Sequence, residues 1–207
     1  MTRREFVSMA AATAAIPGGA QAKLILPVRR VMNSRAKHTS QQIRGFSSTI
    51  WPEAARDFQR CGIELQSSEG KGEVKRSPGD RPVFTGLERG LINMVVTDHI
   101  PMSWDGGRAL SGVSTRYEGY HLCVVALDHA HGHQIPLLSV NTCVHELLHV
   151  LLEEIFVNRP NPMQRGGREL RIDWYATRLW LFHDGWAIRA AVEAYLERAR
   201  AERQASA

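Results

Sequence analysis

The sequence predicts an α+β fold in which a small mixed sheet packs on one central helix and a helical part follows toward the C-terminus. Apolar residues recur at helical spacing over 144–156, which predicts the central helix. Short apolar or alternating runs at 63–66, 91–96 and 121–127 predict strands. Residues 169–183 contain neither proline nor glycine and predict a second helix after a loop.

The remaining elements follow from local stop and start signals. Residues 49–62 predict a helix that begins near Pro52, because proline is tolerated in a first helical turn. Residues 186–204 predict a C-terminal helix rich in Ala, Glu and Arg. Residues 23–45 are expected to form a first strand plus a loosely held arm, and residues 66–81 a flexible loop or hairpin connection.

The central helix carries the sequence His145-Glu146-Leu147-Leu148-His149. Residues four apart share a helix face, so both imidazoles can reach one metal ion while Glu146 points toward a water molecule there. Residues 139–142 offer several N-cap candidates before the helix. This arrangement is typical of a zinc hydrolase.

A hydrolytic zinc site needs a third protein ligand and one open position. Glu169 is the candidate for that ligand, because it begins the second predicted helix. Asp173 lies one turn later and can accept the second ring N–H of a ligand histidine, most plausibly that of His145.

These motifs resemble those of the zincin metallopeptidases, and among them the gluzincin type, in which a helix with His-Glu-x-x-His is followed by a helix with Glu-x-x-x-Asp. The resemblance implies that His145, His149 and Glu169 bind Zn²⁺ and that Asp173 supports them. It also implies that Glu146 is the general base for a zinc-activated water that hydrolyses peptide bonds. The metzincin subgroup is disfavoured, because no glycine or third histidine follows the motif in residues 150–156.

The resemblance also implies a zincin-like fold in one domain, residues 23–207, with an upper part at about 45–157 and a helical lower part at about 168–203. In that fold an edge strand beside the motif helix holds extended substrate, and residues 122–127 are the candidate for it. Tyr175 and His183 are candidates for stabilising the oxyanion that forms when water attacks a carbonyl.

The first 22 residues resemble a twin-arginine export signal. Arg3-Arg4 precede a hydrophobic residue, an alanine-rich stretch covers 10–16, and Ala20-Gln21-Ala22 is a small-x-small cleavage site. The expected partner is the twin-arginine export machinery, and the expected location is the periplasm or the exterior of a bacterial cell. The alternative is an exposed basic N-terminus with a short helix.

Two further groups of residues could bear on the site. His129, His131 and His133 alternate, so in an extended segment they could bind a metal of their own or line the cleft, or they could lie in an ordinary polar loop. Cys61, Cys123 and Cys143 could form one disulfide in three ways, and Cys143 is expected to be a buried small residue or a disulfide partner rather than a ligand.

Composition limits the other function classes. Removing residues 1–22 takes away two arginines and one glutamate, which lowers the formal charge from +5 to +4. This charge is too small and dispersed to indicate nucleic-acid binding, and no apolar run in the rest of the chain has the length of a membrane span. The resemblance to the zincin metallopeptidases implies a peptide or protein substrate as partner. The alternatives are an exported metal-binding or structural protein with a zincin fold and no turnover, or a binding module with an accidental motif.

Overall fold

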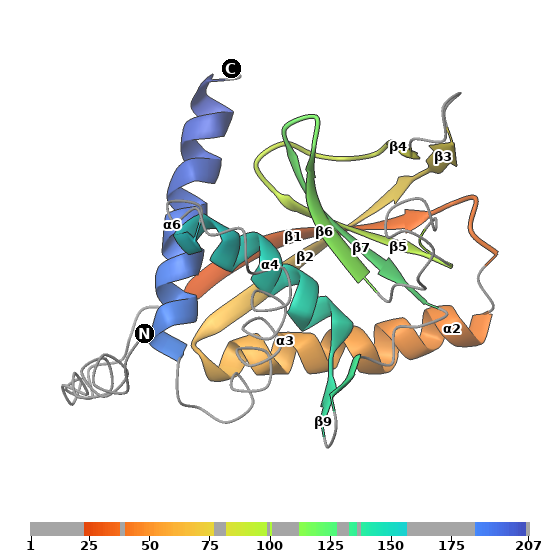
Figure 1. Cartoon of the computed structure of the whole chain (residues 1–207), viewed down its shortest axis with the longest axis horizontal. Helices are drawn as coiled ribbons and strands as arrows, with labels where there is room; N and C mark the ends of the chain where they lie inside the picture. The colour runs from red at the N-terminus through yellow and green to blue at the C-terminus, as the bar shows by residue number, and fades with distance from the viewer. Residues whose placement is uncertain are drawn as a thin grey trace.

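A computed structural model describes residues 23–37, 40–76, 82–98, 100, 112–127, 133–135, 138–156 and 185–205. Its centre is a five-stranded sheet in the order β2-β1-β5-β7-β6, with helices on one face (Figure 1). The strands of this sheet are β1 (Leu24–Asn33), β2 (Ile63–Gly72), β5 (Ile92–Thr97), β6 (Gly112–Tyr117) and β7 (Tyr120–Ala126). The predicted α+β class is confirmed, and the sheet is mostly parallel, with β6 alone antiparallel to its neighbour.

The edge of the sheet differs from the prediction. Strand β7, which covers nearly all of residues 122–127, pairs with β5 on one side and β6 on the other, so it is an interior strand. Its burial from His121 to Ala126 accounts for its mostly apolar sequence, because interior strands of such a sheet are covered on both faces. The edge strand is β6, which a two-residue turn with positive φ at Glu118 and Gly119 joins to β7.

The helices cover one face of the sheet. They are α2 (Ser40–Gly45), the π-helical η1 (Phe46–Ile50), α3 (Trp51–Arg60), α4 (Thr142–Phe156) and α6 (Gly185–Ala205). The helix expected to begin near Pro52 in fact continues from Ser40, so no loose arm occupies residues 40–45. Proline has no N–H to donate to the preceding turn, and the wider π-helical turn lies directly before it.

Residues 66–72 form the second half of β2 rather than a loop. They are polar because β2 lies at the other edge of the sheet, where its side chains face solvent while its backbone pairs with β1 throughout. An ion pair of 2.7 Å between Arg30 and Glu69 joins the two strands. The hairpin expected in this region is confirmed as β3 (Val74–Arg76) paired with β4 (Pro82–Phe84).

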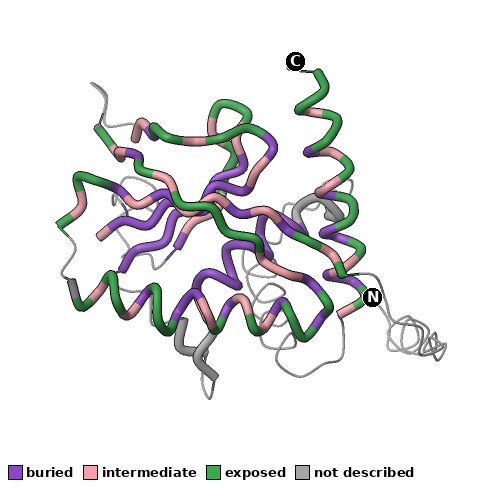
Figure 2. Tube along the Cα trace, turned by 180° about the vertical axis from the view of Figure 1, so that it is seen from behind, coloured by how far each residue is buried: buried purple, intermediate pink, exposed green. Residues whose placement is uncertain are grey.

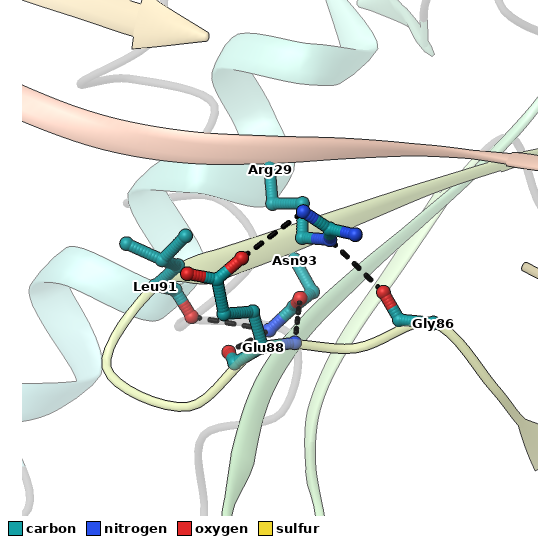
Figure 3. A network of polar contacts seen from close by, with 5 residues as sticks. All are labelled: Arg29, Gly86, Glu88, Leu91 and Asn93. Atoms are coloured by element: carbon teal, nitrogen blue, oxygen red, sulfur yellow. Dashed lines mark hydrogen bonds and ion pairs between the residues drawn. The ribbon is translucent and has the colours of Figure 1, made fainter. Parts of the chain in front are cut away.

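A hydrogen-bond network fixes the connection between β4 and β5 (Figure 3). Arg29 of β1 donates to the carbonyl of Gly86 and to the carboxylate of Glu88, both at 3.0 Å. The fully buried amide of Asn93 accepts from the Glu88 N–H at 2.8 Å and donates to the Glu88 carbonyl at 2.9 Å. These bonds satisfy the backbone of the turn that leads into the central strand β5.

The central strands β5 and β7 are buried along nearly their whole length (Figure 2). Two apolar clusters lie on opposite faces of the sheet, because successive side chains of a strand alternate. In β7, Cys123 and Val125 belong to the larger cluster, which joins the sheet to α3, α4 and α6. Leu122 and Val124 belong to the smaller cluster on the other face, with Phe84 from β4. The larger cluster therefore holds α4 against the sheet.

Within the described ranges, no helix combines the length and apolar character needed to cross a lipid bilayer.

Candidate active site

Helix α4 carries the predicted motif, and its residues 142–152 are buried. It packs against β6, β7 and α6, and its apolar residues Leu147, Leu148 and Leu151 are fully excluded from solvent. The side chain of Asn141 caps it by accepting hydrogen bonds from the N–H groups of Cys143 at 2.9 Å and Val144 at 3.4 Å. The prediction of a capped, apolar motif helix is confirmed.

The two histidines of the motif face each other across one helical turn. The Nε2 atoms of His145 and His149 are 3.0 Å apart, and their ring centroids are 4.7 Å apart. The residues are only 2% and 8% exposed. Because this burial excludes most water from the two rings, the hydrogen-bond partners of their nitrogens must come from the protein or from a bound group.

This pair fits a tetrahedral zinc ion. Two imidazole nitrogens at about 2.0–2.1 Å from one such ion are separated by about 3.3 Å, close to the spacing found here. Neutral imidazole nitrogens are also a donor type that zinc prefers. The donor type and the spacing of the two rings therefore both suit the metal implied by the sequence.

Glu146 lies between the helix and the edge strand and is 2% exposed. Its carboxylate Oε2 accepts a hydrogen bond of 2.7 Å from the hydroxyl of Ser114 in β6. The carboxylate also lies directly against Gly112 of the same strand. The motif carboxylate is thus held from the side of the sheet by strand β6.

The sequence did not single out Gly112 or Ser114. The signal was present in the alternation of Val113, Thr115 and Tyr117 before the turn residues Glu118-Gly119, which together are typical of a hairpin strand.

The other predicted site residues cannot be placed against α4. Glu169, Asp173, Tyr175 and His183 all lie outside the described residues, as do the export signal at 1–22 and the histidines His129 and His131. His133 begins the short strand β8 (His133–Ile135), which pairs with β9 (Leu138–Val140). Among the described residues, no group of three His, Cys, Asp or Glu side chains could hold a metal.

All three cysteines are buried free thiols. Burial raises the pKa of Cys143, and the nearby charge of Glu146 raises it further. A protonated thiol is a poor metal ligand, so Cys143 fits the expected role of a small buried residue. Burial likewise raises the pKa of Cys61 to about 11.

A second polar group was not expected from the sequence. His121, at the start of β7, packs edge-to-face on Tyr195 of α6 with ring centroids 5.1 Å apart. Its Nε2 lies 3.4 Å from a guanidinium nitrogen of Arg116. Burial lowers the pKa of His121 to about 4, and the charges of Arg116 and Arg198 contribute in the same direction. This histidine is therefore neutral near pH 7.

Comparisons with protein families, with curated proteins and with solved structures found no match to this chain.

Proposed function

We propose that the chain is a zinc-dependent peptidase with a zincin-like fold of the gluzincin type, acting on peptide bonds outside the cytoplasm. The observation that carries this proposal is the joint placement of three motif side chains. Two buried imidazole nitrogens lie 3.0 Å apart on one face of α4, and the Glu146 carboxylate between them in sequence is held against the edge strand. A peptidase of this class needs both parts.

His145 and His149 would bind Zn²⁺ from α4, with Glu169 as third ligand and Asp173 orienting a ligand ring. When bound, zinc would lower the pKa of a water molecule, and its positive charge would polarise the substrate carbonyl. Glu146 takes the proton of the attacking water and passes it to the leaving amine. Tyr175 and His183 remain the proposed residues for the oxyanion.

The buried Glu146 also separates this proposal from that of an exported metal-binding protein without turnover. Burying a carboxylate is costly, and Glu146 is only 2% exposed. A metal carrier without turnover has no use for such a carboxylate on its metal-binding helix. A peptidase needs that group for proton transfer.

Metal analysis together with peptide cleavage tests the proposal. The purified mature protein, Glu169→Ala and Asp173→Ala are each assayed for zinc content and for cleavage of a mixed peptide library by mass spectrometry. We expect about one zinc per chain and cleavage for the parent, an empty site for Glu169→Ala, and a zinc affinity lowered about 10–100-fold for Asp173→Ala. Full zinc in Glu169→Ala would show that the third ligand is another residue, and zinc binding without any cleavage would favour the metal-binding protein.

The location has its own test. Arg3→Lys combined with Arg4→Lys should trap the full-length chain inside bacterial cells, whereas the parent chain should be found outside the cytoplasm with a new N-terminus near Lys23. Equal export of both chains would remove the twin-arginine assignment.

A further inference from the structure

The helix-facing side of the edge strand β6 has an unusual composition. Successive strand residues alternate between faces, and Val113 and Tyr117 of β6 pack in the cluster on the far face. Gly112, Ser114 and Arg116 therefore face the helices. The first two of these contact Glu146 of α4, and Arg116 reaches His121 and Glu202.

The hydroxyl of Ser114 contacts both the side chain and the backbone of Glu146. Its oxygen lies 2.7 Å from carboxylate Oε2 and 2.8 Å from the carbonyl oxygen of Glu146. A serine hydroxyl has one proton, so it can donate fully to only one of these acceptors at a time. The thiol of Cys123, 3.4 Å from the same carbonyl, can donate there instead. Ser114 is then available to donate to the carboxylate.

Gly112 makes room for the carboxylate. A Cβ atom at this position would lie 2.6 Å from Cγ and 2.7 Å from Cδ of Glu146, and it would overlap Oε1 as well. Such approaches are much shorter than van der Waals contact, so any side chain at position 112 would displace the carboxylate. The backbone at Gly112 does not have positive φ, which means that space rather than conformation accounts for the glycine.

We propose that β6 is a positioning element for the general base, in which the Ser114 hydroxyl fixes the Glu146 carboxylate and the missing side chain of Gly112 provides the space that it occupies. This inference rests on the proposed peptidase function and assigns to Ser114 and Gly112 a role that the motif itself does not contain. A base that is misplaced by about 1 Å can lose on the order of 100-fold in rate, so a small displacement of this carboxylate has a large effect.

Ser114→Ala, with Ser114→Thr as the conservative variant, tests the role of the hydroxyl. Ser68→Ala is the matched control, because it removes an exposed strand hydroxyl at the opposite edge of the sheet. For Ser114→Ala we expect kcat to fall about 10–100-fold, with KM and zinc content close to those of the parent. The thermal midpoint should drop slightly, because a buried carboxylate loses a hydrogen bond. Ser114→Thr should restore most of kcat, and Ser68→Ala should behave like the parent. A purely structural role would instead lower the thermal midpoint and leave the kcat of the folded, zinc-loaded variant unchanged, or it would lower the zinc content.

Gly112→Ala tests the space requirement and should lower kcat at least as much. If this variant fails to fold, the serine variants still decide the question. Unchanged kcat in Ser114→Ala, or a loss confined to KM or zinc content, would overturn the positioning role while the peptidase assignment stands. If the zinc-loaded parent cleaves no peptide at all, the proposed function fails, and the positioning role fails with it.

Discussion

The side-chain amide of Asn141 donates a hydrogen bond of 2.7 Å to the main-chain carbonyl of Ile50, 91 residues earlier in the chain. The oxygen of the same amide accepts hydrogen bonds from the N–H groups of Cys143 and Val144 in the first turn of α4. One residue therefore both caps the motif helix and attaches its start to the end of η1.

Asn141→Ala should lower the free energy of unfolding by about 1–2 kcal/mol, because it removes an N-cap and an interhelical hydrogen bond together. Asn141→Asp keeps the capping oxygen but loses the donor to Ile50, so its loss should be smaller. Urea unfolding of the three proteins measures the difference. Equal stability of the alanine variant and the parent would mean that α4 does not depend on this cap.

Glu146→Gln should abolish measurable turnover while the protein keeps its zinc. The substitution nearly preserves shape and can still contact Ser114, but an amide cannot accept the proton of the attacking water. General-base catalysis typically contributes about 10²–10⁴-fold, and kcat should fall by at least that factor. Cleavage assays paired with zinc analysis check both halves of the expectation. A variant with parental kcat would assign proton transfer to another group.

Zinc removal should destabilise the parent protein. The metal would bind the folded chain but not the unfolded chain, which has no preformed site, so bound zinc would favour the folded state. Treatment with EDTA is expected to lower the thermal midpoint of the parent and to leave that of His149→Ala unchanged. Restoring zinc should return the parent to its original midpoint. If the chelator has the same effect on both proteins, the metal is bound at a different place.

Acid should weaken the fold through His121. Its pKa in the folded protein is about 4, below its ordinary value of 6.5, so the unfolded chain binds more protons between these values. Stability is therefore expected to fall as the pH drops from about 6.5 to about 4, since protonation would place a charge at a buried position that the positive charges of Arg116 and Arg198 also disfavour. One pKa unit corresponds to about 1.4 kcal/mol of unfolding free energy. After partial solvent screening, the loss of unfolding free energy caused by protonating His121 is about 2 kcal/mol.

The matched variant for this effect is His121→Phe, which keeps an aromatic ring against Tyr195. Chemical unfolding of zinc-free parent and variant at pH 7 and pH 4.5 isolates the contribution of His121, because all other titrating groups are common to both. Parallel pH dependence in the two proteins would contradict the assignment.

The motif helix could be predicted because its signals are local. The apolar spacing of Val144, Leu147, Leu148 and Leu151 and the cap at Asn141 are contained within a few turns, and the structure confirms both. The two imidazoles then share a face through helix geometry alone, as the 3.0 Å separation shows.

The sheet edges could not be predicted in the same way. The second half of β2 is polar, and its strand conformation comes from pairing with β1 rather than from its own side chains. Strand β6 has the same length as β5 but lacks its continuous apolar run, so only a weak alternating pattern marks it as a strand. It nevertheless contributes Ser114 and Gly112 to the site. Glu146 is separated from these two residues by 32 and 34 positions in the sequence. Their contact depends on tertiary packing, which no local sequence pattern reveals.

The most direct test of the account is X-ray absorption at the zinc edge of the purified protein. The account predicts one zinc ion per chain, with two imidazole nitrogens and one carboxylate oxygen among its ligands at about 2.0–2.2 Å. Sulfur ligands at about 2.3 Å, or protein that binds no zinc when the metal is supplied, would contradict it.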